Sequence, residues 1–264
     1  ARMNLVLHGV SDFDIRSGNT LHEPALIEGD RLKTFDVVLA NPPYSIKKWN
    51  HEAWQSDPWG RNFLGTPPQG RADYAFFQHI LKSMAPKTGR CAILFPLGVL
   101  ERHAESDLRR NLVEQDLIEC VLGLGKDLFY NSPMEACVVI CKSKKPADRV
   151  GKVLFINAVN EIQRERSQSF LKPEHQERIL RVYQQFADVP GFAKVATVED
   201  ILDLNGTLSI RKYVRAGTNS SVEVEMSIIE AWQGFEKGGS AFWKEMESLT
   251  ELLEAALSEE ASDV

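Results

Sequence analysis

Short apolar runs alternate along this chain with segments whose apolar residues recur at helical spacing. The apolar runs predict strands, which we place at residues 36–40, 91–95, 117–122, 136–141 and 153–156. The helical spacing predicts helices at residues 73–85, 104–114 and 173–186, with the end of another at 1–9 and a short capped one at 197–202. Strands that alternate with helices in this way are typical of an α/β fold.

The run at residues 36–40 predicts a strand buried on both faces, of the kind found in parallel sheets, and it stops at Asn41-Pro42-Pro43-Tyr44. Open α/β sheets bind ligands beyond the carboxyl ends of their strands, so this corner is a candidate site. Each proline fixes its own backbone φ and lacks an N–H, which leaves a stiff loop rich in hydrogen-bond acceptors. The Asn41 side-chain oxygen and the Pro42 carbonyl can both accept from one planar amino group, while Tyr44 offers a flat face to the ring that carries it. Such an arrangement favours methylation of an exocyclic amine.

This motif resembles the catalytic motif of amino-group DNA methyltransferases, (Asp/Asn/Ser)-Pro-Pro-(Tyr/Phe/Trp). The chain is most similar to the N6-adenine modification (M) subunit of type I restriction-modification systems, from about residue 3 to about residue 214. A second pair, Pro67-Pro68, follows no strand and carries no such context. The other similar segments are Gly18-Asn19-Thr20-Leu21, Ala72-Asp73-Tyr74-Ala75-Phe76-Phe77-Gln78-His79-Ile80-Leu81, Leu128-Phe129-Tyr130, Gly151-Lys152-Val153-Leu154-Phe155-Ile156 and Leu208-Ser209-Ile210-Arg211-Lys212-Tyr213-Val214.

The resemblance implies a class I S-adenosylmethionine-dependent methyltransferase fold, a Rossmann-like, doubly wound sheet. Its catalytic residues would be Asn41, Pro42, Pro43 and Tyr44. Asn19, Asn41 and Asp73 would bind the S-adenosylmethionine cofactor. For Asn19 a plain Gly-Asn turn is the alternative, and for Asp73 a helix cap.

The same resemblance implies double-stranded DNA as substrate, with the target adenine flipped out of the helix. Phe129 would stack on the flipped base opposite Tyr44, with Tyr130 as second choice; simple packing of both rings between strands is the alternative. A specificity subunit, and possibly a restriction subunit, would be partners.

In this family the glycine-rich loop and the acidic residue that hold the cofactor precede the helix at residues 1–9, and we find neither in the sequence. We therefore expect an N-terminally incomplete catalytic domain at residues 1–145, and residues 146–218 packed on it. A helical C-terminal extension follows, as an acidic tail at residues 219–264.

The charge distribution bears on the DNA partner. The net charge is −6, but residues 219–264 carry 11 acidic and 2 basic side chains, which leaves a small positive charge on the remainder. Since affinity for phosphate comes largely from Lys and Arg, we expect another subunit to hold the duplex.

Cysteine and histidine usage narrows the chemistry further. The four cysteines lie in apolar runs without metal-ligand spacing, so we predict buried reduced thiols, and the six scattered histidines predict no metal site. The chain shows no membrane-spanning run and no signal-peptide pattern, so a cytoplasmic location is the default.

Residues 45–71 form a long segment with three tryptophans, Trp49, Trp54 and Trp59, which we interpret as a rim over the site. The alternative is that these rings pin the segment to its own core. Two other functions stay open: a protein glutamine methyltransferase, which also carries Asn-Pro-Pro-Tyr, and a non-catalytic truncated subunit of a DNA-modification complex.

Overall fold

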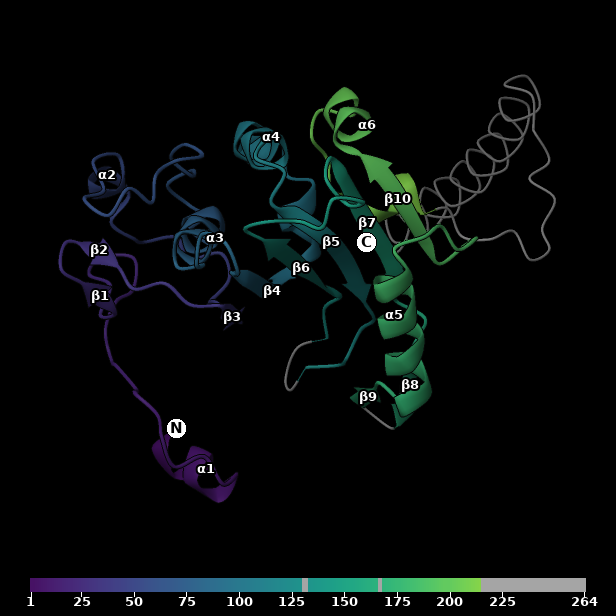
Figure 1. Ribbon diagram of the computed structural model, residues 1–264, viewed down its shortest axis with the longest axis horizontal. Helices are drawn as coiled ribbons and strands as arrows, with labels where there is room; N and C mark the ends of the chain where they lie inside the picture. The colour runs from purple at the N-terminus through teal and green to yellow at the C-terminus, as the bar shows by residue number, and fades with distance from the viewer. Residues whose placement is uncertain (130–132, 166–167, 215–264) are drawn as a thin grey trace, which may run out of the picture. The chain divides into compact units, whose positions relative to one another are not determined.

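A computed structural model of the protein describes residues 1–129, 133–165 and 168–214 (Figure 1). The helices are α1 (Arg2–Leu7), α2 (His51–Trp54), α3 (Asp73–Lys82), α4 (Ser106–Glu114), α5 (Pro173–Gln185), α6 (Val198–Asp203) and α7 (Ile210–Tyr213), with 3₁₀ turns at Leu97–Leu100 and His103–Glu105. The strands are β1 (Ile27–Glu28), β2 (Arg31–Leu32), β3 (Val37–Ala40), β4 (Arg90–Pro96), β5 (Ile118–Leu124), β6 (Ala136–Lys142), β7 (Lys152–Ala158), β8 (Gln163–Glu165), β9 (Gln168–Phe170) and β10 (Ala193–Thr197). The acidic tail predicted at residues 219–264 lies outside the described residues.

The main sheet has six strands in the order β10-β7-β5-β6-β4-β3. Strand β3 runs parallel to β4, and β5 runs parallel to β7. Strand β6 is antiparallel to both of its neighbours, and β10 is antiparallel to β7, so the sheet is mixed. The carboxyl ends of β3, β4, β5 and β7 therefore meet at one edge of the sheet, where a site is expected.

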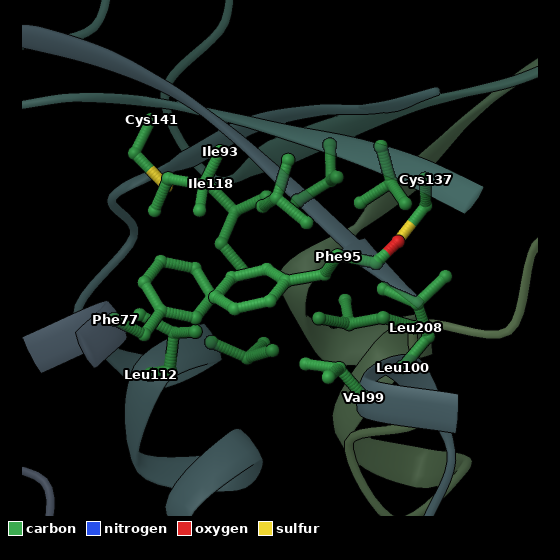
Figure 2. Packing of buried hydrophobic residues seen from close by; sticks show 14 of the residues in the cluster. Phe77, Ile93, Phe95, Val99, Leu100, Leu112, Ile118, Cys137, Cys141 and Leu208 are labelled. Atoms are coloured by element: carbon green, nitrogen blue, oxygen red, sulfur yellow. The ribbon is translucent and has the colours of Figure 1, made fainter. Parts of the chain in front are cut away.

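Helices cover both faces of the sheet. On one face, α3, α4 and α6 pack over the large core, whose aromatic centre Figure 2 shows around Phe77 and Phe95. On the other face, α5 packs over Leu154 and Ile156 of β7. Residues alternate between these faces along β7, since Val153 and Phe155 belong to the first core. The predicted α/β class is confirmed, because helices and strands alternate around a mixed sheet.

The prediction of full burial for residues 36–40 is wrong. Strand β3 has one sheet neighbour among the described residues, and the exposed fractions of Val37 and Leu39 are 48% and 77%. An apolar run of this length does not distinguish a central strand from one at the margin of the sheet, and in the described part of the chain β3 pairs on one side only.

The buried thiols are confirmed: Cys91, Cys120, Cys137 and Cys141 are free and buried. The Cys137 thiol points at the Phe95 carbonyl oxygen, 3.5 Å away, inside the large core (Figure 2). Burial raises the pKa of this thiol to about 12, so it stays protonated. None of the helices in the described ranges combines the length and apolar character that a membrane crossing requires.

Candidate active site

The Asn-Pro-Pro-Tyr loop leaves the carboxyl end of β3 and reaches the protein surface. Asn41 is exposed, Pro42 is buried and Tyr44 is half-buried. The Tyr44 hydroxyl donates a hydrogen bond to Asn41 Oδ1 over 2.6 Å. Asn41 and Pro42 also line a cavity of about 360 Å³, together with Thr20, Ala40, Phe76 and His79. The two predicted acceptor residues thus border open space.

The Tyr44 ring packs against the large core, with Cys137 nearby. Burial, and after it the proximity of Cys137 and Asp73, raises the pKa of the Tyr44 hydroxyl above its usual value. Tyr44 therefore remains a neutral hydrogen-bond donor at physiological pH, with its ring held by apolar contacts.

Asp73 fixes the backbone that follows Tyr44. Its carboxylate is fully buried; Oδ1 accepts from the Ser45 backbone N–H over 2.9 Å, and Oδ2 is 2.5 Å from Arg102 Nη1. Ser45 has a φ of +51°, a left-handed conformation that is costly for a residue other than glycine and needs support from its surroundings. The alternative of a helix cap is wrong, because Ala72 is the N-cap of α3 and no side chain caps it. Asp73 instead ties α3 to the end of the Asn-Pro-Pro-Tyr loop.

Arg102 is shared between two buried carboxylates. Its Nη1 lies 3.3 Å from Glu105 Oε2 as well as contacting Asp73. Burial raises the pKa of the Glu105 carboxyl above its usual value, with Arg102 opposing that shift. The sequence does not predict that Arg102 and Glu105 belong to this site, because neither residue lies in a recognisable motif.

Asn19 forms a turn at one wall of the same cavity. Its Oδ1 accepts from the backbone N–H groups of Leu21 and His22 at 3.2 and 3.3 Å, and the side chain is exposed. This is the geometry of the Gly-Asn turn alternative, with the amide nitrogen directed elsewhere. Thr20, the next residue, lines both the cavity beside Asn41 and a second one of about 420 Å³.

Two further residues that the sequence did not reveal lie beside that turn. Arg61 is buried and donates to the carbonyls of Thr20 and Leu21. His79 lines both cavities, and its pKa is lowered to about 4 by burial and then by the charge of Arg61. His79 is therefore neutral near pH 7.

The structure places two of the remaining aromatic residues named in the sequence analysis, Phe129 and Trp54. Phe129 is half-buried and follows β5, whose carboxyl end meets the same sheet edge as that of β3; Tyr130 lies outside the described residues. Trp54 is only 2% exposed and packs with Leu21, Ala72 and Ala75, so for this ring the pinning alternative holds. Within the described part of the chain, no three His, Cys, Asp or Glu side chains gather as a possible metal site.

Taken together, an Asn-Pro-Pro-Tyr corner at the end of a strand, beside a cavity and in a mixed α/β sheet, defines a protein of the methyltransferase class. The model of the N-6 DNA methylase family matches residues 1–221, and the chain belongs to that family.

Relatives and solved structures agree with this assignment. The chain is 33% identical over 226 residues to the methylase subunit of the type I restriction enzyme MjaVII of Methanocaldococcus jannaschii, a match that covers 81% of this chain and 38% of that protein. It is 28% identical over 282 residues to the HindI methylase subunit of Haemophilus influenzae, covering 99% of this chain and 56% of that one. The crystal structure of the type I restriction-modification methyltransferase subunit from Streptococcus thermophilus matches with a TM-score of 0.74 and 34% identity, over 81% of this chain and 45% of that one. The chain thus spans about two fifths to just over half of the length of these proteins.

Proposed function

We propose that this chain is the catalytic part of the modification subunit of a type I restriction-modification system, and that it methylates adenine N6 in DNA with S-adenosylmethionine. The observation that carries the proposal is the exposed acceptor corner of Asn41 and Pro42, with the Tyr44 ring beside it and a cavity in front. A protein glutamine methyltransferase also uses such a corner, but membership of the N-6 DNA methylase family favours the nucleobase.

The corner suits an amine that must stay neutral and reactive. An exocyclic amino group that donates both hydrogens, to Asn41 Oδ1 and to the Pro42 carbonyl, is fixed in orientation, and its lone pair is directed away from both acceptors. The nitrogen attacks while neutral and loses a proton after the new C–N bond forms, so no strong base is required, and rate comes from positioning and electrostatics. The base ring would lie between Tyr44 and Phe129.

The same geometry supports an assignment of the residues that would bind the cofactor. S-adenosylmethionine supplies an electrophilic methyl group on a sulfonium. The Asn19 amide nitrogen is suited to donate to a ring nitrogen of its adenine, since the Asn19 oxygen is engaged in the turn. Asn41 would border the cofactor as well as the target amine, because it lines the cavity that adjoins the Thr20 wall. Asp73, with both oxygens engaged, would serve the cofactor site by holding the loop after Tyr44.

The doubly wound sheet would be that of a class I methyltransferase, with residues 1–145 as the catalytic domain and residues 146–218 packed on it. Strands β7 and β10 of the second part extend the sheet of the first. The partners would be double-stranded DNA, a specificity subunit that holds it and a restriction subunit, in the cytoplasm.

The experiment compares Asn41→Ala with wild type in the full-length subunit assembled with its specificity subunit. Transfer of labelled methyl groups to a duplex is measured, and the product is identified by mass spectrometry of the nucleosides. We expect N6-methyladenine from wild type and a loss in kcat of about 10²- to 10³-fold in the variant, the size seen when one preorganised polar group is removed from an active site. Asn4→Ala, at an exposed position of α1, is the control and should methylate normally. Methylation by Asn41→Ala within threefold of wild type would refute the proposal.

A further inference from the structure

Arg61 is a buried cation in the middle of the tryptophan-rich segment. The side chains of Arg61 and Asp57 are 1% and 2% exposed, and they form a paired contact: Nε donates to Oδ1 at 2.9 Å and Nη2 to the same oxygen at 2.6 Å. The Arg61 backbone N–H donates to the second carboxylate oxygen at 2.8 Å. Asp57 therefore fixes both the main chain and the head group of Arg61.

Two aromatic rings confine the same guanidinium. Its central carbon lies 4.6 Å from the centre of the Trp54 ring and 4.9 Å from that of Trp59. Such contacts are favourable for a planar cation, and they restrict its orientation. A buried ion pair by itself contributes little net stability, because the cost of desolvation offsets most of the attraction between the charges. The orientation of the head group thus points to a further role.

The remaining N–H groups of the Arg61 guanidinium donate to residues about 40 positions earlier in the chain. Nη1 donates to the Thr20 carbonyl at 2.8 Å, and Nη2 donates to the Leu21 carbonyl at 3.0 Å. These two peptide units form the turn in which the backbone N–H groups of Leu21, His22 and Glu23 donate to Asn19. Arg61 thus donates to the carbonyls of the turn, while the oxygens of Asn19 accept from its backbone N–H groups.

The turn is one wall of the cavities described above. Thr20 lines both of them, and so does His79, whose Nδ1 lies 3.5 Å from Arg61 Nη1. A shift of the turn would move this wall relative to Asn41, which also lines the smaller cavity.

We propose that Arg61, oriented by Asp57 and the two tryptophan rings, is a positioning residue that sets the place of the turn at residues 19–21 and thereby the affinity for the cofactor. The inference rests on the proposed function, because it assigns the turn to cofactor binding. Arg61 acts only through the turn and touches neither reacting atom. A lysine at the same position would keep the charge but lose the planar fork that serves two carbonyls at once.

The test measures Arg61→Lys in the full-length subunit assembled with its specificity subunit. We expect KM for S-adenosylmethionine to rise about tenfold while kcat at saturating cofactor stays within twofold, and amide hydrogen exchange at Leu21, His22 and Glu23 to become at least tenfold faster without cofactor. Arg110→Lys is the matched control, since Arg110 is 48% exposed and pairs with Glu114 on the surface of α4. An unchanged KM, an equal loss in kcat, or unchanged exchange at these three amides would each overturn the inference.

Trp59→Leu removes one ring from the guanidinium at a half-buried position and keeps the ion pair, so it serves if Arg61→Lys does not fold. It should raise KM for the cofactor about threefold and leave kcat unchanged; no rise in KM would overturn the inference. A wild-type complex that does not methylate DNA would refute the proposed function, whereas an active wild type with an unaltered Arg61→Lys variant would refute this inference alone. The amide exchange measurement reports on the stability of the turn whether or not the complex methylates DNA.

Discussion

Because of the hydrogen bond between Tyr44 and Asn41, two substitutions of Tyr44 should change the binding of an extruded base in opposite directions. In the free protein the Tyr44 hydroxyl occupies Asn41 Oδ1 at 2.6 Å, the acceptor that the target amine would use. The amine would compete with this hydroxyl for the same oxygen. Tyr44→Phe removes the competing donor and keeps the ring, so binding of the extruded base should strengthen.

The magnitude follows from the worth of one such hydrogen bond. A neutral hydrogen bond contributes about 0.5–1.5 kcal/mol net, and for exposed Asn41 the lower half of that range applies, so Tyr44→Phe should tighten binding of the extruded base about twofold to fivefold. Tyr44→Ala removes the stacking face, worth about 1–3 kcal/mol per base, and should weaken binding about 5- to 150-fold.

The assay titrates the assembled complex against duplex DNA with 2-aminopurine at the target adenine, whose fluorescence rises on extrusion. Tyr213→Phe is the control: it removes a hydroxyl that donates to the Thr207 carbonyl at 2.6 Å, far along the chain from the loop, and should leave extrusion unchanged. Binding by Tyr44→Phe that is fivefold weaker than wild type would refute the reasoning, because the hydroxyl would then hold the substrate itself.

Two further predictions concern stability and are measured by urea denaturation. Asp73→Asn should lower the free energy of unfolding by about 2 kcal/mol, because Arg102 loses its charge partner. Asp73→Ala should lower it by about 1 kcal/mol more, because the Ser45 N–H also loses its acceptor. Equal values for the two variants would contradict a contribution from the hydrogen bond to Ser45. The pKa of His79 is lowered from 6.5 to about 4, so between these pH values the unfolded chain binds a proton that the folded chain does not. From this residue alone, the free energy of unfolding should fall by about 2 kcal/mol between pH 7 and pH 5. His79→Asn should lose that share of the pH dependence, and an identical pH dependence in the variant would contradict the prediction.

The regular elements could be predicted because each depends on a local pattern. Helix α5 begins at Pro173, a residue suited to the first turn, and its apolar positions recur at helical spacing. Helix α6 follows Thr197, which accepts from the Asp200 backbone N–H, while Asp200 bonds back to Thr197. Both helices were therefore predicted close to their observed bounds.

What could not be predicted depends on contacts between distant parts of the chain. Strand β10 was missed, because its five residues carry little apolar pattern and it is stabilised by antiparallel pairing with β7. The contact between Arg61 and the turn at Thr20 joins residues about 40 apart, and the only local sign of it is Asp57 four residues before Arg61. The placement of Asn41 at the surface followed from its position after a strand, whereas the occupation of its oxygen by Tyr44 is a matter of side-chain geometry that no sequence pattern encodes.

The marginal position of β3 has a consequence for work with the protein. Its outer backbone N–H and C=O groups face no strand among the described residues, and Leu39 and Val37 stand exposed next to them. A strand with an open side and apolar side chains is a template for adding the backbone of another molecule. A sample of these 264 residues alone should therefore self-associate through the strand that leads into the Asn-Pro-Pro-Tyr loop. Leu39→Lys should keep the sample monodisperse in light scattering.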